Sequence, residues 1–344
     1  MIGAVPRGGL CPFNLVGEDV QVRILLIPTI ADDALAVGKS LLPPGYTLIL
    51  GDPKEGGPAL AAKVRQADVI IGFIGRLPPE AWEAARGQIK LIHTLSAGYE
   101  EIELDKAREL GIPVCTNGGA NAISVAEHTI MLMLAAYRRL PDLVATTRAG
   151  KWRGLMGEVR YYELAGKTVG IVGMGNIGRE VAKRLRGWSV HTIYYDVFRR
   201  SPAEEAELGI SYTPLDELFR QSDVVTLHTP LTKETHHLVN AERLALMKPT
   251  AVLVNAARGG LVDEAALLAA LNDKQILFAA LDTLGQEPPP ADHPLLRHPN
   301  AIVTPHVAGP TWDSWPRRFA NAYANVTRIA RGEPPAWLVP ELRG

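Results

Sequence analysis

Three charged side chains in the C-terminal half of the chain have the types that proton-transfer chemistry on a carboxylic acid requires. Arg258, Glu287 and His306 each lie in a loop after an apolar run. An arginine can bind a carboxylate through two parallel hydrogen bonds and polarise a neighbouring carbonyl, and a histidine can exchange a proton with oxygen. A glutamate beside the histidine raises the histidine pKa from its usual value of about 6.5 and sets its tautomer. Taken singly, each residue also fits a structural role, as a helix-entry charge, an acid before prolines and a satisfied loop histidine.

A glycine-rich turn indicates where a ligand of these residues would be anchored. The apolar run from Val169 leads directly into Gly173, Gly175 and Gly178. Such a turn uses one glycine for a tight bend, one for close approach of the backbone to a pyrophosphate, and one for packing of helix on strand. The helix that follows offers unpaired amides and a positive dipole end to the anion. The pattern predicts a dinucleotide site, although a glycine-rich turn that binds no ligand can have the same residue pattern.

An acidic residue supports the dinucleotide interpretation and favours NAD. The run 190–195 is predicted to be the next strand, and it ends in Asp196, about 20 residues after the glycines. A carboxylate there accepts hydrogen bonds from the adenosine ribose and repels a 2′-phosphate. Arg199 and Arg200 follow; they fit solvated loop charges better than a 2′-phosphate site, so NAD is preferred and NADP is not excluded.

Composition narrows the class of protein and of partner. The 344 residues suggest two domains, 47% are apolar, and the net charge of −1 gives no reason to expect nucleic acid or an anionic membrane as partner. Cys11 and Cys115 are the only cysteines, which favours a reducing, cytoplasmic location over a disulfide framework. The start of the chain lacks the pattern of a secretory signal, and the longest apolar stretch, 125–136, is too short to span a membrane. The adjacent His236 and His237 lack further ligands at metal-binding spacing, so no metal is expected.

Alternating apolar and helical segments predict two α/β arrays. In the first array, strands are expected at 22–27, 46–50, 68–73, 90–94 and 112–115. The second begins at Lys167 and continues through six strands, at 190–195, 210–212, 224–228, 251–255, 277–281 and 302–304. This alternation is typical of doubly wound parallel sheets, which bind ligands beyond the carboxyl ends of their strands.

The segments outside the two arrays are less regular. Residues 1–20 have no periodicity and are expected to be an extension or lead-in. One long helix is predicted over 121–140, stopped by Pro141. The segment 146–163 has weak periodicity and carries the aromatic residues Trp152, Tyr161 and Tyr162, so we expect it to pack against a partner subunit, most simply in a homodimer.

Several motifs together resemble the NAD-dependent D-2-hydroxyacid dehydrogenase family, over about residues 22–336. They are Ser-Val-Ala-Glu-His-Thr at 124–129, the glycine turn with Asp196, His-Thr-Pro-Leu-Thr at 228–232, Asn-Ala-Ala-Arg-Gly-Gly-Leu-Val-Asp-Glu at 255–264, Ala-Leu-Asp-Thr at 280–283 with Glu287-Pro288, and Thr-Pro-His-Val-Ala-Gly at 304–309. The resemblance implies a catalytic triad of Arg258, Glu287 and His306. It also implies that backbone amides of Ser96, Ala97 and Gly98 bind the substrate carboxylate with Arg258.

The resemblance further implies the cofactor contacts and the domain plan. Besides Arg258 and His306, the residues expected at NAD are Thr129, Gly173, Gly175, Asn176, Ile177, Gly178, Asp196, Thr229, Pro230, Ala256, Asp282 and Gly309. Asp282 would accept from the nicotinamide carboxamide. The expected plan is a Rossmann dinucleotide-binding domain over residues 121–310, inserted into a flavodoxin-like substrate domain made of 1–120 and 311–344.

The implied reaction is hydride transfer between NAD(H) and a 2-hydroxy or 2-oxo acid of D configuration. Phosphoglycerate dehydrogenases of this family place cationic side chains near the strand that here ends at Ile74, so a phosphorylated substrate is disfavoured, although Arg76 keeps it open. Trp312 and Trp315 fit either a core or interface role or the wall of a substrate pocket. The alternative function is an NAD(H)-sensing, corepressor-like interaction protein with little or no turnover, because such proteins share the fold and even the triad.

Overall fold

The computed structural model describes residues 21–343 except 29, 53, 154 and 156. The described residues form two compact units, one within residues 1–121 and 311–344 and the other within residues 122–310. The lead-in expected at residues 1–20 lies outside the described residues. In the described residues, no helix is both long and apolar enough to cross a membrane.

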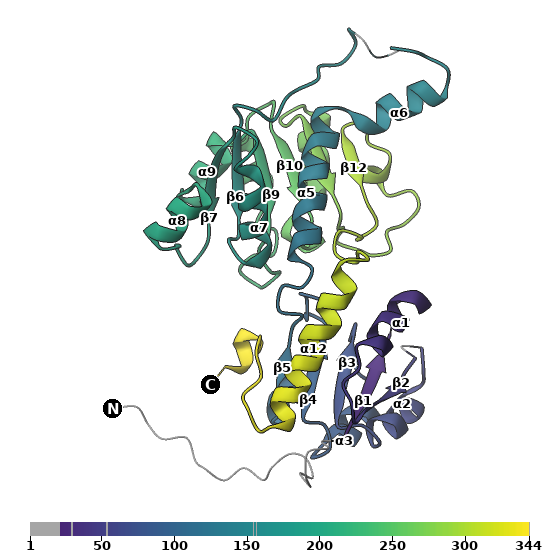
Figure 1. The fold of residues 1–344 in the computed structure, drawn as a ribbon. Helices are drawn as coiled ribbons and strands as arrows, with labels where there is room; N and C mark the ends of the chain where they lie inside the picture. The colour runs from purple at the N-terminus through teal and green to yellow at the C-terminus, as the bar shows by residue number, and fades with distance from the viewer. Residues whose placement is uncertain (1–20, 29, 53, 154, 156, 344) are drawn as a thin grey trace. The chain divides into compact units, whose positions relative to one another are not determined.

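The first unit is a five-stranded parallel sheet with helices on both faces. Its strand order is β2-β1-β3-β4-β5, with β1 Val22–Ile27, β2 Tyr46–Leu50, β3 Val69–Gly72, β4 Leu91–Thr94 and β5 Val114–Cys115. The helices are α1 Asp32–Ser40, α2 Gly57–Val64, α3 Pro79–Ala85, α4 Leu104–Glu109 and α12 Ser314–Ala330. Helices α1 and α12 cover one face, and α2, α3 and α4 cover the other (Figure 1). Strands β1, β3, β4 and β5 are buried almost throughout, whereas the edge strand β2 is partly exposed.

The second unit contains a seven-stranded parallel sheet in the order β12-β11-β10-β9-β6-β7-β8. The strands are β6 Thr168–Val172, β7 His191–Tyr195, β8 Ile210–Tyr212, β9 Val224–Leu227, β10 Val252–Asn255, β11 Phe278–Leu281 and β12 Ala301–Val303. The helices are α5 Ala122–Tyr137, α6 Leu140–Arg148, α7 Asn176–Leu185, α8 Pro202–Leu208, α9 Leu215–Gln221, α10 Ala241–Leu246 and α11 Glu264–Asn272. The order reverses direction at β6, as in doubly wound nucleotide-binding sheets. The expected fold class, two parallel-sheet α/β domains, is confirmed.

Parallel pairing brings the predicted chemistry to one edge of the second sheet. Strands β6, β9, β10, β11 and β12 end directly before the loops that carry the glycine turn, Thr229, Arg258, Glu287 and His306. Because all these strands run in the same direction, their carboxyl ends share an edge.

Two local predictions need correction. The sheet has seven strands and not six, because the apolar strand expected before the glycine turn, β6, adds to the six that follow it. The helix predicted over 121–140 is α5, which ends earlier, at Tyr137, and a second helix that was not predicted, α6, begins at Leu140. Pro141 lies in the first turn of α6, where a missing amide costs nothing, and Arg139 adopts a left-handed conformation with φ of 52° that separates the helices.

Candidate active site

The glycine turn has the geometry that dinucleotide binding requires. Gly173 has a φ of 96°, and a Cβ there would lie 2.6 Å from the carbonyl carbon of His228. A Cβ on Gly178 would lie 2.2 Å from the carbonyl oxygen of Gly173, so helix α7 can approach β6 only with glycine at this position. By contrast, a Cβ on Gly175 would have no protein atom within 4 Å. The turn therefore leaves room above Gly175 and no room at Gly173 or Gly178.

The start of α7 faces this space with its backbone amides. Gly175 is the N-cap residue, and because it is glycine no side chain caps the helix. Asn176 and Ile177 are the first helical residues. The first amides of a helix have no partner within it and carry the positive end of the helix dipole. These residues suit a pyrophosphate, which would bind to the amides across the open side of Gly175.

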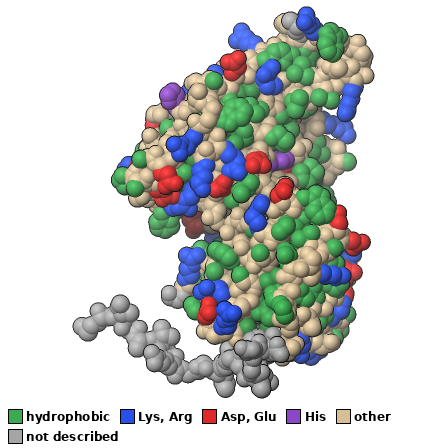
Figure 2. Space-filling model, in the orientation of Figure 1, with side chains coloured by type: hydrophobic (Ala, Val, Ile, Leu, Met, Phe, Trp, Pro, Cys, Tyr) green, Lys and Arg blue, Asp and Glu red, His purple; other side chains and the backbone are tan. Residues whose placement is uncertain are grey.

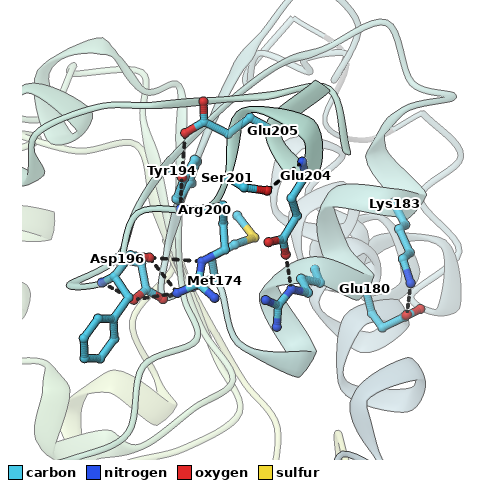
Figure 3. A network of polar contacts seen from close by, with 11 residues as sticks. Met174, Glu180, Lys183, Tyr194, Asp196, Arg200, Ser201, Glu204 and Glu205 are labelled. Atoms are coloured by element: carbon cyan, nitrogen blue, oxygen red, sulfur yellow. Dashed lines mark hydrogen bonds and ion pairs between the residues drawn. The ribbon is translucent and has the colours of Figure 1, made fainter. Parts of the chain in front are cut away.

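Asp196 is held beside the turn by its neighbours (Figure 3). Its Oδ2 accepts a hydrogen bond from the amide of Met174 at 2.7 Å, and its Oδ1 accepts one from the amide of Phe198 at 2.9 Å. The guanidinium of Arg200 lies 3.4 Å from Oδ1, whereas Arg199 pairs with Glu205 at 3.0 Å. Both arginines thus have acidic partners, and Asp196 directly follows β7, where the sequence predicts the ribose contact.

Two predicted cofactor residues, Ala256 and Ile177, take part in one apolar cluster. Val125 of α5, Ala256 and Ala308 form a small buried cluster, against which Ile177 packs. Thr129 is fully buried, and its hydroxyl donates to the carbonyl of Val125 at 2.8 Å. The remaining predicted positions Thr229, Pro230 and Gly309 lie in loops beyond β9 and β12, half-buried or exposed.

The loop that carries Arg258 is held by a buried asparagine. Asn255, at the end of β10, donates to the carbonyl of Arg258 at 2.9 Å and accepts from the amide of Ala257 at 3.0 Å. Gly259 lies so close to the backbone of Leu284 that a Cβ would overlap its carbonyl carbon. This close approach packs the Arg258 loop against the turn that precedes Glu287.

His306 and Glu287 form a direct hydrogen bond. Nδ1 of His306 lies 2.7 Å from Oε2 of Glu287, while Oε1 of Glu287 accepts from the amide of Leu284 at 2.9 Å. About 45% of the His306 side chain is exposed, and among the described residues none is within hydrogen-bonding distance of its Nε2. The carboxylate therefore orients the ring and leaves the second nitrogen open to a ligand.

Electrostatics favour the ionised form of Glu287. Partial burial acts to raise its pKa, but hydrogen bonds from His306 and from the amide of Leu284 outweigh that effect. The positive charges of His306 and Arg258 act in the same direction, and together they hold the Glu287 pKa below its usual value. Of the three predicted catalytic side chains, His306 and Glu287 are in direct contact, and the positive charge of Arg258 acts on the Glu287 pKa.

Asp282 organises the segment that carries His306. Its carboxylate is fully buried and accepts from the Thr304 hydroxyl at 2.6 Å and from the amides of Val307 and Ala308 at 3.0 and 2.9 Å. Burial acts to raise its pKa, but these bonds and one from His128 lower it overall. The side chain has no accessible surface, so its predicted contact with the nicotinamide carboxamide stays a prediction.

The predicted carboxylate-binding loop lies in the first unit and has unpaired amides. The hydroxyl of Thr94 accepts from the amide of Ser96 at 2.8 Å, and the hydroxyl of Ser96 donates to the carbonyl of Gly98 at 2.6 Å. Among the described residues, the amides of Ala97 and Gly98 have no acceptor. Arg318, which is buried, donates to the carbonyl of Leu95 beneath this loop.

Three other predicted positions of the first unit are also described. Trp315 is buried in the core, with its ring edge against Phe73, which fits a packing role; Trp312 is 58% exposed. Arg76 lines a pocket together with Glu100, Glu101 and Glu103. Three acidic side chains beside one cation make this pocket unfavourable for a phosphate group.

Residues 130–308 match the family described as "D-isomer specific 2-hydroxyacid dehydrogenase, NAD binding domain". The chain belongs to the D-2-hydroxyacid dehydrogenase family. The match covers the second unit from α5 to the loop of His306, so this unit is the NAD-binding domain and the family is one of NAD-dependent dehydrogenases. The resemblance drawn from the motifs, the enzyme class and the cofactor are confirmed.

Individual relatives agree with this assignment. A glyoxylate reductase of Thermofilum pendens is 38% identical over 310 residues, which is 88% of this chain and 91% of the relative. A D-3-phosphoglycerate dehydrogenase of Methanocaldococcus jannaschii is 37% identical over 91% of this chain, which corresponds to 58% of that longer protein. The structure of a D-lactate dehydrogenase with NAD+ from Lactobacillus jensenii has a TM-score of 0.76 at 28% identity, covering 92% of this chain and 99% of that one.

Sequence reasoning did not single out three residues that support the site. His128 and Thr304 contact Asp282 or its partner, and Arg318 holds the loop at Leu95. His128 stands inside a motif that was quoted only for Thr129, so its position in the motif was the available signal. Arg318 offered none, because a charged residue on an amphipathic helix is normally solvated.

Proposed function

We propose that this protein reduces a small 2-oxo acid to the D-2-hydroxy acid with NADH, and catalyses the reverse reaction, with Arg258, Glu287 and His306 as its catalytic residues. The observation that carries the proposal is the 2.7 Å bond between His306 and Glu287 in a site where Arg258 adds positive charge. A histidine paired in this way through Nδ1 has Nε2 available as the proton donor.

Each side chain has a distinct role in this proposal. The nicotinamide, when bound, supplies or accepts the hydride at carbon 2 of the substrate. His306 donates its Nε2 proton to the oxygen on carbon 2 as negative charge develops there, and Glu287 stabilises the cationic ring before the transfer. Arg258 binds the substrate carboxylate through two parallel hydrogen bonds and polarises the carbonyl.

We infer that the substrate is a small monoanionic 2-oxo acid such as glyoxylate. The acidic surroundings of Arg76 support this, because they disfavour a phosphorylated side chain. The relatives named glyoxylate reductase, with high mutual coverage, support it as well. The corepressor-like alternative is not favoured, since the comparisons are with dehydrogenases.

We further propose a homodimer formed through α6. All side chains of α6 are at least partly exposed, and Leu140, Val144 and the following Trp152 are 48%, 39% and 81% exposed. Figure 1 shows α6 at one end of the second unit, and Figure 2 shows hydrophobic side chains there. An apolar surface of this kind marks an association site. Val144→Glu should convert the dimer to a monomer in analytical ultracentrifugation.

Oxidation of NADH with a panel of 2-oxo acids tests the proposed activity. We expect turnover with glyoxylate or hydroxypyruvate, a much lower rate with phosphohydroxypyruvate, and a loss of about a hundredfold or more in kcat with His306→Gln. Arg258→Lys should raise KM and lower kcat, because lysine cannot form the bidentate pair. Tight NADH binding without turnover of any acid in the panel would refute the proposal and leave the sensing function.

A further inference from the structure

We propose that His128, in helix α5, is a positioning residue that keeps the catalytic His306 in place through Thr304 and Asp282. The inference rests on the proposed function, since it concerns the reach of His306 toward the substrate. It does not concern the hydride step itself. It assigns a role to the one titratable side chain of the Ser-Val-Ala-Glu-His-Thr motif that points toward the strand ends.

The contacts form a continuous chain from helix to loop. Nε2 of His128 lies 3.1 Å from the hydroxyl oxygen of Thr304, and 3.4 Å from Oδ1 of Asp282. The Thr304 hydroxyl donates to the same Oδ1 at 2.6 Å, so its oxygen is left to accept a hydrogen from Nε2 of His128. The contacts thus require the tautomer of His128 that carries its proton on Nε2.

Asp282 transmits this arrangement to His306. Its carboxylate accepts from the amides of Val307 and Ala308, and its backbone carbonyl accepts from the amide of His306 at 2.8 Å. His306 has a φ of 53°, a left-handed conformation that a non-glycine residue keeps only when its surroundings impose it. The bonds from Asp282 on both sides of that residue supply the constraint.

Burial makes the chain of contacts hard to replace with water. The side chain of His128 is 14% exposed, and that of Asp282 is inaccessible. A buried carboxylate that loses a donor keeps its desolvation cost, so it would relax by shifting the loop or by drawing in water. Either change moves the imidazole relative to Glu287 and the substrate, and a misplacement near 1 Å costs about a hundredfold in rate.

The test compares His128→Leu with His128→Gln. Leucine removes the donor, whereas the amide nitrogen of glutamine reaches the place of Nε2. We expect His128→Leu to lower kcat about ten- to a hundredfold with less than a threefold change in KM for glyoxylate, and to raise the solvent deuterium isotope effect on kcat, because proton transfer becomes slower. His128→Gln should recover most of the lost rate. Glu127→Gln, one position earlier and 63% exposed, is the matched control and should leave these readouts unchanged.

Hydrogen exchange provides a readout that does not depend on turnover. In His128→Leu the amides of 306–308 should exchange faster, while those of β6 and β9 keep wild-type rates. Thr304→Val, with Thr304→Ser as its partner, tests the same chain if His128→Leu fails to fold. Unchanged kcat, isotope effect and exchange in His128→Leu, or an equal loss in His128→Gln, would overturn the positioning role. Absence of turnover in the wild-type protein would instead overturn the proposed function, and exchange would still decide the role of His128.

Discussion

Gly175 and Gly178 provide a matched pair that separates cofactor binding from folding. A Cβ on Gly175 has no protein atom within 4 Å, and its φ of −76° and ψ of −157° are accessible to alanine. We therefore expect Gly175→Ala to change the free energy of unfolding by less than about 0.5 kcal/mol. Its methyl group would occupy the space that a pyrophosphate needs, so NADH binding should weaken about ten- to a hundredfold, equivalent to about 1.4–2.7 kcal/mol.

Gly178→Ala should show the opposite balance. Its Cβ would lie 2.2 Å from the carbonyl oxygen of Gly173, so α7 must move away from β6. Overpacking of this kind costs about 1–3 kcal/mol, which corresponds to a melting temperature lower by roughly 3–9 °C for a domain of this size. Calorimetry and NADH fluorescence titration measure both quantities. Wild-type NADH affinity in Gly175→Ala would refute the placement of the pyrophosphate, and an unaltered melting temperature in Gly178→Ala would refute the packing argument.

Three further predictions concern charge. Asp196→Ser should lower kcat/KM for NADH about tenfold and raise the NADPH to NADH ratio, because the ribose acceptor and its repulsion of a 2′-phosphate are both lost; an unchanged ratio in initial-rate assays would contradict this role. Glu287→Gln should lower kcat about ten- to a hundredfold. In the wild type, protonation of Glu287 in acid should reduce activity, at a pH below the usual range of a glutamate because the Glu287 pKa is lowered. This loss of activity in acid should be absent from Glu287→Gln. Burial lowers the pKa of His93 to about 4, so the neutral ring contributes stability that is complete above pH 6.5 and is lost as the pH falls toward 4. Between pH 7 and pH 5, the free energy of unfolding measured with urea should therefore fall less in His93→Leu than in wild type. Some decrease should remain because of His228, whose pKa burial lowers to about 3. An equal decrease in both proteins would argue against a buried, neutral His93.

Local sequence patterns predicted most of the elements, and tertiary context explains the misses. Apolar runs bounded by turn residues located the strands, because strands buried on both faces must be apolar throughout. Pro141 was taken as the end of one helix, yet it occupies the first turn of the next, a position that proline tolerates equally well. Only the backbone at Arg139, with its positive φ, distinguishes the two arrangements.

The sequence by itself determined the family, the NAD-binding turn and the three residue types at the catalytic edge. These features are local: the spacing of Gly173, Gly175 and Gly178 and the position of Asp196 follow from backbone geometry over a few residues, and the motifs around Arg258, Glu287 and His306 are contiguous. Tertiary structure alone decided which of these side chains touch. The 2.7 Å bond between His306 and Glu287 and the contact of His128 with Thr304 join residues 19 and 176 positions apart. Periodicity along a chain carries no information on such distances, because they depend on how parallel strands align at their common edge.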